Sequence, residues 1–515
     1  MSVLLIRGPK RLWPMVNYWD NFLPPQNLLC LAAYLEENGI EVKIVDSCIN
    51  KWGWKRTKRA IEIINPSIVG VGEPITWADE GIRALKLAKE VNPEILTLAG
   101  GPHYFNIPEY YLTQESPLDI IVYGEGEKTL LEIVKKHNNP NFKKELKEIR
   151  GIIYRKKNNI ITTKPRPLIE DLDNLPLPAY HLIPMERYER KNALWKGGST
   201  IYHSRGCISE CSFCSCWLPM SKKKLVDGNL EMHCFWRTKS VEKTLEEIKI
   251  LEDEYNKDFL IFVDDTWNVN KKWNKDFAEK KIEWGLESKW FAFMRTDFIL
   301  RDFKAGVFKK LVDSGLSHII VGVERASTEE ILKFNKKGYT SNKSYLAFQI
   351  LKHYPQVFRQ GTFVNGIWED DKESILAQAD YAKKIGVDYP SFHCLTPQPG
   401  TQLWDEAEKK GIIEFHDFSR YSWFTPVMPT KHLDTEDVAK YTMLTNARFI
   451  RDPLWFVKGL LSKSKIRRWN YWWFVKQIIT STILALKERI NPLTISRDAE
   501  KTAYLRLVKP DWYND

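Results

Sequence analysis

Short apolar runs alternate with helical patterns along the first part of the chain. The runs lie at residues 3–6, 42–45, 68–71, 95–98 and 120–123, and amphipathic stretches separate them. Apolar strands that alternate with helices are typical of a parallel sheet covered on both faces. The pattern therefore predicts an α/β fold whose first domain, residues 1–145, is doubly wound.

A second series of apolar runs follows a connecting segment. Residues 152–154 and 160–163 read as a hairpin, and Pro176, Pro178 and Pro184 follow it, so we expect residues 146–195 to link two domains. The next runs lie at residues 201–203, 259–263, 290–294, 318–323, 361–364 and 391–395. Six strands with helices between them predict a partial (β/α)6 barrel over residues 196–414. Residues 415–515 are predicted to form a helical C-terminal domain.

Composition and charge indicate a folded globular protein. Hydrophobic residues make up 43% and charged residues 28% of the 515 positions. The net charge is +11, but the lysines and arginines are spread along the chain without a long basic block, so we expect no nucleic acid partner. Four of the 8 cysteines fall between Cys207 and Cys216, which favours reduced thiols and a cytoplasmic protein over a disulfide framework. The apolar start at residues 2–6 is too short for a signal peptide.

The aromatic and aliphatic stretch at residues 469–486 is interrupted by Lys476 and Gln477. It falls short of the ~20 apolar residues that span a bilayer, so we predict an amphipathic helix. With Arg467 and Arg468 beside it, two interpretations stay open: contact with a membrane surface or partner, and ordinary packing.

Three cysteines follow the first run of the second series with the spacing C-x3-C-x2-C: Cys207, Cys211 and Cys214. Three thiolates hold three irons of a [4Fe-4S] cluster and leave the fourth iron open. The alternative is a zinc site completed by Cys216 or His233. Because ligation by Cys216 would close the open iron, we treat it as a neighbour.

The cysteine motif and the short motifs around it resemble cobalamin-binding radical S-adenosylmethionine (SAM) proteins, the group that contains class B methylases and the anaerobic magnesium-protoporphyrin monomethyl ester cyclase. The markers, in chain order, are PPQNL at 24–28, GCISECSFC at 206–214, WRT at 236–238, FVDD at 262–265, MRTD at 294–297, GVE at 322–324 and LTPQPGT at 395–401. FTPVMPTK at 424–431 is similar to the cyclase branch.

The resemblance implies three cofactors: a [4Fe-4S] cluster, SAM and cobalamin. For SAM it implies Phe213, Asp264, Asp265, Arg295 and Glu324, although each charged residue fits equally an ordinary salt-bridge network at a barrel rim. For cobalamin it implies Asp46, Ser47, Gly72, Gly100, Gly101, His103, Gly124 and Glu125.

One departure from related cobalamin proteins concerns the metal. The stretch after the second strand holds no histidine, so the resemblance implies cobalamin without a histidine lower ligand. Cys48 could lie beneath the cobalt, but a buried cysteine that packs as a small hydrophobe is commoner. His103 could contact the corrin or cap its turn.

The resemblance implies a C-methyltransferase that moves a methyl group from SAM through methylcobalamin to an unactivated carbon of a peptide, lipid or small metabolite. A reducing partner such as ferredoxin or flavodoxin would supply electrons, and an anaerobic setting is expected. The alternative is a radical oxidative cyclase of the magnesium-protoporphyrin type. A cobalamin sensor or chaperone without catalysis is a third hypothesis, against which the intact cysteine triplet argues. The sequence singles out no catalytic acid or base.

Overall fold

The first domain is built on a seven-stranded sheet. This computed structural model describes residues 2–11, 23–188, 194, 197–487 and 509–515. The strands are β1 (Ser2–Arg7), β2 (Glu41–Asp46), β3 (Ile68–Val71), β4 (Leu96–Gly100), β5 (Ile120–Val122), β6 (Ile152–Lys156) and β7 (Asn159–Thr162). Their order is β2-β1-β3-β4-β5-β6-β7, with β1 to β5 parallel and β6 and β7 antiparallel.

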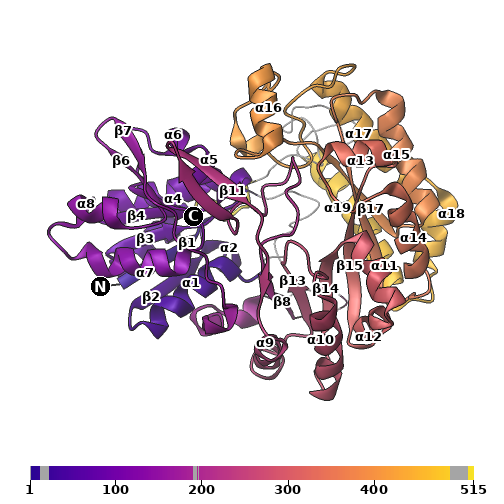
Figure 1. Ribbon diagram of the computed structural model, residues 1–515, viewed down its shortest axis with the longest axis horizontal. Coiled ribbons are helices and arrows are strands. Elements are labelled where there is room, and N and C mark those ends of the chain that lie inside the picture. The colour runs from indigo at the N-terminus through magenta and orange to yellow at the C-terminus, as the bar shows by residue number, and fades with distance from the viewer. Residues whose placement is uncertain (1, 12–22, 189–193, 195–196, 488–508) are drawn as a thin grey trace.

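Helices cover both faces of this sheet, as Figure 1 shows. They are α1 (Gln26–Glu37), α2 (Ser47–Asn50), α3 (Trp54–Ile64), α4 (Ala78–Val91), α5 (Pro102–Asn106), α6 (Pro108–Tyr111), α7 (Gly126–His137) and α8 (Phe142–Glu145). Val3 and Leu5 pack in the cluster that contains α1 and α7, whereas Leu4 and Ile6 pack with α3 and α4. Because neither face of β1 meets water, the strand is apolar throughout. The doubly wound fold is confirmed.

The hairpin of β6 and β7 differs from its expected place in the connecting segment. β6 pairs antiparallel with β5, with Ile153 opposite Ile121, so the hairpin extends the first sheet. The physical reason is that β5 would otherwise leave a row of backbone groups unpaired at the sheet edge. Residue 195, where we expected the connecting segment to end, lies outside the described residues.

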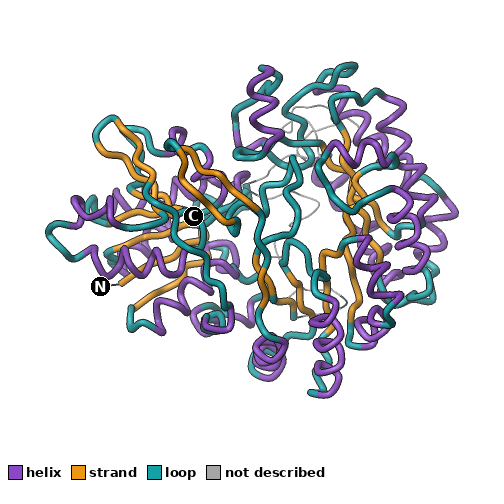
Figure 2. The backbone as a smooth tube through the Cα atoms, viewed as in Figure 1, coloured by secondary structure: helices purple, strands orange, loops and turns teal. Residues whose placement is uncertain are grey.

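The second sheet has six parallel strands in sequence order, which confirms the partial barrel. They are β8 (Gly198–Ile201), β13 (Phe259–Phe262), β14 (Lys289–Met294), β15 (Leu316–Glu324), β16 (Phe358–Asn365) and β17 (Tyr389–Cys394). The helices outside them are α9 (Val241–Asp253), α10 (Lys271–Glu283), α11 (Thr296–Lys304), α12 (Val307–Asp313), α13 (Thr328–Lys333), α14 (Ser341–Leu351) and α15 (Lys372–Ile385), and α16 (Gln402–Lys410) follows β17. Figure 2 shows the strands of the two sheets as separate groups.

A short insert lies between β8 and α9. It contains the pair β9 (Ser204–Arg205) and β12 (Arg237–Thr238) and the hairpin β10 (Lys222–Val226) and β11 (Asn229–His233). Asp227 and Gly228, both at positive φ, form the hairpin turn, a dipeptide signal that could have revealed it in the sequence. Leu230 and Met232 pack against the core of the first domain. The insert therefore bridges the two sheets.

Three more helices lie in the described part of the C-terminal region, which excludes residues 488–508: α17 (Thr435–Ile450), α18 (Pro453–Leu460) and α19 (Lys465–Lys487). α17 packs against α15 and β17. Apolar side chains lie on the exposed side of α19 as well as on its packed side, so it is less amphipathic than expected. None of the helices described is long and apolar enough to cross a membrane.

Candidate cofactor-binding site

The three cysteines lie together on the loop that follows β9. Cys207, Cys211 and Cys214 are half-buried and free of disulfide bonds. The Cys214 amide donates to the carbonyl of Cys211 at 3.1 Å, and the Cys207 sulfur lies 3.5 Å from the Thr266 hydroxyl. The charge of Cys214 acts on Cys207, and both act on Cys211. The loop therefore gathers three thiols at one place.

Burial keeps these thiols protonated in the absence of metal. Burial raises the pKa of Cys207, and it raises that of Cys211 to about 12. A hydrogen bond with the neighbouring Cys216 thiol and burial together raise the pKa of Cys214 well above its ordinary value. Since iron binds thiolates, the metal must displace these protons.

The donor set fits an iron-sulfur cubane. Within the described residues, no three His, Cys, Asp or Glu side chains converge on a point where one ion could bind. A cubane makes no such demand, because each cysteine binds a different iron. Cys216 is exposed beside Cys214 and stays a neighbour in our interpretation.

Buried polar side chains fix the beginning and the middle of this loop. Asp264 accepts hydrogen bonds from the Ser204 amide and hydroxyl at 2.6 and 2.5 Å, and its Oδ1 lies 2.8 Å from His203 Nδ1. These contacts end β8 at Ile201, two residues before the predicted strand ended. Arg295 donates to the Ser209 hydroxyl at 2.6 Å, in the middle of the cysteine loop. Asp264 and Arg295 thus position the loop.

Gly206 shows why the loop needs a residue without a side chain. Its φ is +83°, and a Cβ there would lie 1.9 Å from the carbonyl oxygen of Phe235. Phe213 packs its ring edge against Phe334 at 4.9 Å and joins an apolar cluster at the ends of β16 and β17. The loop is therefore packed as well as hydrogen-bonded.

Two carboxylates remain close to the cysteines. In the part of the chain that the structure describes, no hydrogen bond reaches Asp265, and burial with the adjacent Asp264 raises its pKa to about 7. Its charge acts on Cys207. Glu324, at φ +65°, forms a buried ion pair with Lys336, whose charge acts on Cys211. An unpaired carboxyl beside the cluster loop fits the ammonium group of SAM.

Glycines line the edge of the first sheet where β3, β4 and β5 end. Gly72, Gly100 and Gly124 follow or end these strands, and Gly101, at φ +135°, opens α5. No protein atom lies within 4 Å of a Cβ built on Gly124. Ligands of open α/β sheets bind at this edge. The backbone here leaves room for a bulky, flat group to approach.

His103 is an unsatisfied polar group on the same edge. It is 3% exposed, burial lowers its pKa to about 3, and its Nε2 has no hydrogen-bond partner among the described residues. Its ring packs against Tyr104 and Tyr111 at 4.0 and 5.8 Å. A buried neutral imidazole without a partner fits a ligand that supplies one.

Three residues near the end of β2 are engaged within the protein. Asp46 caps α2 and accepts a hydrogen bond from the Tyr188 hydroxyl at 2.5 Å. The Ser47 hydroxyl lies 2.8 Å from that of Thr57. The Cys48 thiol is fully buried and donates to the Gly8 carbonyl at 3.2 Å. These contacts support a structural role for all three, and cobalt ligation by Cys48 has no support from them.

Glu125 joins the two domains. Its Oε1 accepts from Arg205 at 2.7 Å and also from Arg237, while its Oε2 accepts from the Ile169 amide at 2.6 Å. Arg205 also donates to Glu127 at 2.6 Å. All four charged side chains are at most 7% exposed. Glu125 therefore ties the first sheet to the strand that leads into the cysteine loop.

Sequence reasoning missed several of these residues. Lys336 lies in an N-K-K-G stretch that looks like an exposed turn, and Glu127 shows no local pattern. Each residue acquires its role only through partners far along the chain. Arg205, two positions before the cysteine motif, and Arg237, in the WRT marker, lie beside signals in the sequence, but neither signal assigns them a role.

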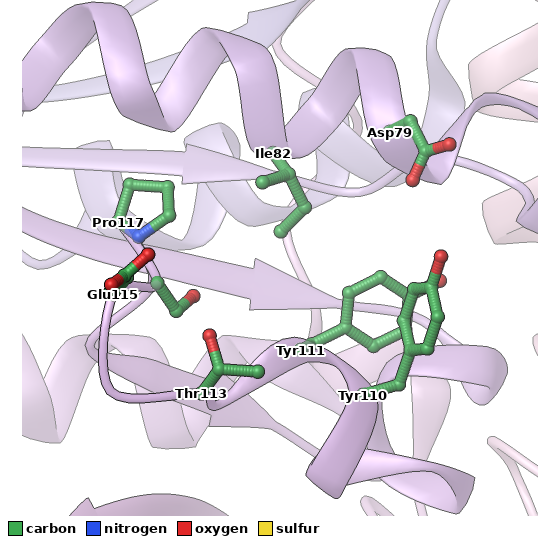
Figure 3. A pocket seen from close by; sticks show the side chains of 8 residues that line it. Asp79, Ile82, Tyr110, Tyr111, Thr113, Glu115 and Pro117 are labelled. Carbon is green, nitrogen blue, oxygen red and sulfur yellow. The ribbon is translucent and has the colours of Figure 1, made fainter.

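One cavity of about 210 Å³ lies on the first domain (Figure 3), where Tyr111, which also packs against His103, is part of its lining. Tyr110 and Tyr111 lie below Asp79 in it, and Glu115 is on its rim. None of the predicted site residues lines it.

Known proteins match both halves of the chain. Residues 13–134 match the B12 binding domain family, and residues 201–357 match the Radical SAM superfamily. An uncharacterised methyltransferase of Pyrococcus horikoshii is 31% identical over 437 residues, which cover 85% of this chain and 90% of that protein. An anaerobic magnesium-protoporphyrin IX monomethyl ester cyclase of Rubrivivax gelatinosus is 29% identical over 453 residues, covering 86% and 77%.

A solved structure shares the fold at low identity. The cobalamin-dependent S-adenosylmethionine radical enzyme OxsB, with aqua-cobalamin and S-adenosylmethionine bound, matches with a TM-score of 0.69 and 16% identity. The match covers 96% of this chain and 73% of that chain. The arrangement of the two sheets and the C-terminal helices is therefore a shared architecture.

Proposed function

This chain belongs to the cobalamin-binding radical SAM family, and we propose that it is a C-methyltransferase that methylates an unactivated carbon. It is a radical SAM enzyme with a [4Fe-4S] cluster, SAM and cobalamin as cofactors. The name of the Pyrococcus relative supports methyl transfer.

When bound, the three cofactors would together supply an electron, a carbon-centred radical and a transferable methyl group. In our proposal Cys207, Cys211 and Cys214 hold the cluster. The Asp265 carboxylate would accept hydrogen bonds from the amino group of SAM. Arg295 keeps the cysteine loop in place through Ser209. The hairpin β10–β11 packs across to the first domain and helps to exclude water.

The buried contacts of Arg205 are the observation that carries this proposal. The Arg205 guanidinium donates hydrogen bonds to Glu125 and Glu127 of the first domain, and Arg205 lies two residues before Cys207. Buried ion pairs hold position only when both partners stay in place. A methyltransferase of this kind needs a fixed relation between the corrin edge and the cluster loop, and Arg205 links the two.

We place the substrate among peptides, lipids and small metabolites. The electron donor is a low-potential protein such as ferredoxin or flavodoxin. All 8 cysteines are free thiols, which supports a reducing, cytoplasmic setting.

The oxidative cyclase is the second candidate, because the Rubrivivax relative is 29% identical. The cyclase-like segment, residues 424–431, discriminates only weakly between a methyltransferase and a cyclase. Val427 and Met428 in it are buried at 0% and 4% exposure. Met428 packs with Val364 of the barrel and Val427 packs with Phe418 and Tyr421, so the similarity is explained by packing as well as by a shared reaction.

The test is anaerobic incubation of the reconstituted protein with cobalamin, a reductant and methyl-deuterated SAM in a lysate of the source cells. Mass spectrometry should find a product that carries a trideuteromethyl group. The Cys211→Ala protein is the negative control and should give no labelled product, whereas the Cys216→Ala protein should still label it. Formation of 5'-deoxyadenosine with an unlabelled, dehydrogenated or oxygenated product would replace the methyltransferase by the cyclase.

A further inference from the structure

The outer side of α18 and α19 exposes apolar side chains among basic ones. Leu454, Val457 and Leu461 are 70%, 51% and 75% exposed, and Trp472, Ile479, Ile483 and Leu486 are between 49% and 62% exposed. Lys458, Lys463, Lys465, Arg468 and Lys476 are exposed beside them. We call these twelve residues the basic-apolar surface. Large exposed apolar groups gathered in one region mark an interaction site.

The charge of this region is one-sided. Residues 453–487 contain seven Lys and Arg residues (458, 463, 465, 467, 468, 476 and 487) and no Asp or Glu. Their +7 is more than half of the net +11 of the whole chain. The rest of the chain is therefore close to neutral, and its excess positive charge is concentrated here.

The opposite side of α19 is anchored to the barrel. The Tyr471 hydroxyl donates to the Asp388 carbonyl at 2.8 Å, and Phe474 stacks on Tyr389 at 4.1 Å. A Cβ on Gly459 of α18 would lie 2.0 Å from the Tyr471 ring, so the two helices pack closely. This packing fixes which residues of α19 point outward.

The outward residues of α19 follow helical spacing. Trp472, Ile479, Ile483 and Leu486 recur at intervals of seven, four and three residues, which places them on one stripe. Lys465, Arg468 and Lys476 fall on the same stripe. Basic and apolar groups therefore alternate along one exposed line about six turns long.

We propose that the basic-apolar surface docks the enzyme on an anionic membrane. Leucine and isoleucine side chains enter the boundary between headgroups and acyl chains, and tryptophan is favoured at that depth. Lysine and arginine bury their alkyl stems there and keep their charges at the phosphates. A protein partner would have to match the five exposed basic residues and the scattered apolar tips with one complementary surface.

The position of this surface determines how the docked enzyme is oriented. α19 meets Phe358 and Tyr389, the first residues of β16 and β17. The cysteine loop packs at the other ends of these strands through Phe213. The first half of α19 therefore lies at the end of the barrel opposite the cluster, and docking requires no lipid substrate.

Vesicle sedimentation of the full-length, anaerobically reconstituted protein tests the proposal. Phosphatidylcholine vesicles with phosphatidylglycerol should bind it, and vesicles of phosphatidylcholine alone should bind it weakly. High salt should release it. The triple change Lys465→Glu, Arg468→Glu and Lys476→Glu should weaken binding at least ~100-fold, since each charge near an anionic surface is worth about fivefold.

The matched control reverses three exposed lysines elsewhere, Lys271→Glu, Lys272→Glu and Lys275→Glu on α10, and should bind as the wild type does. Leu454→Ser with Leu461→Ser should weaken binding without changing charge. Cluster absorbance in each variant reports folding. Absence of binding to phosphatidylglycerol, an equal loss in the α10 control, or a dimer dissociated by the α19 changes would overturn the proposal.

Discussion

The cysteine loop and the glycine edge of the first sheet are joined at Arg205 and are built in different ways. Side chains hold the cysteine loop: Asp264 bonds its beginning, and Arg295 bonds Ser209 at its middle. The glycine edge is shaped by backbone, with Gly101 in a conformation that other residues avoid. The comparison teaches that a small cluster is positioned by buried charge, whereas a wide planar ligand is accommodated by removing side chains.

Removal of one cluster cysteine should have the largest effect. Cys207→Ala, Cys211→Ala or Cys214→Ala leaves two thiols, and two cannot hold a site-differentiated cubane. We expect loss of iron, of sulfide and of visible absorbance after reconstitution. The Cys216→Ala protein should keep its iron, its sulfide and its visible absorbance. An equal loss in Cys216→Ala would show that the exposed cysteine is a ligand.

Breaking the link between the two regions should come next. Arg205→Met leaves Glu125 and Glu127 buried with fewer partners, and the free energy of unfolding should fall by about 3–5 kcal/mol. Denaturant titration of the apoprotein measures it. The control is Arg448→Met, whose pair with Asp380 is half-exposed and is worth about 0–1 kcal/mol. A similar loss of unfolding free energy in both variants would contradict a special role for Arg205.

Gly101→Ala should affect the ligand more than the fold. A φ of +135° with ψ of 154° costs a residue with a side chain about 1–3 kcal/mol, and the new Cβ would lie 3.4 Å from the His103 ring. Spectroscopic titration should show weaker cobalamin binding. Gly39→Ala, at φ +74° with no atom within 4 Å, carries strain alone and should bind cobalamin normally. Unchanged binding by Gly101→Ala would contradict a corrin contact at this turn.

His103 should produce the smallest effect, a change in pH dependence. Burial lowers its pKa to about 3, below the ordinary value near 6.5. Between these values the unfolded chain binds the proton and the folded chain does not, so stability is present above about pH 6.5 and is lost as pH falls. Between about pH 7 and about pH 5, the His103→Gln protein should lose less stability than the wild type does. His353 is exposed, so the His353→Gln protein should show the same dependence of stability on pH as the wild type. The same dependence in His103→Gln would contradict a buried, neutral His103.

The strands could be predicted because their signal is local. Val3 to Ile6 are apolar since both faces of the first sheet are covered. Strands of the barrel such as β15 and β17 alternate instead between buried and partly exposed positions, and this period of two is also a local signal. Individual ends were less certain: β8 stops at Ile201 because the next amides bond to Asp264, 60 residues away. The β10–β11 hairpin also carries a local signal, the turn dipeptide Asp227-Gly228.

The sequence by itself determined the two α/β domains, the cysteine triplet and the glycine edge, because apolar periodicity and motif spacing are written in neighbouring residues. Only the tertiary structure decided that Glu125 is an interdomain tether, that Asp264 positions the loop and that Lys336 pairs with Glu324. The physical reason is that a buried charge needs a partner, and the chain brings that partner from 12 to 80 residues away only when it folds.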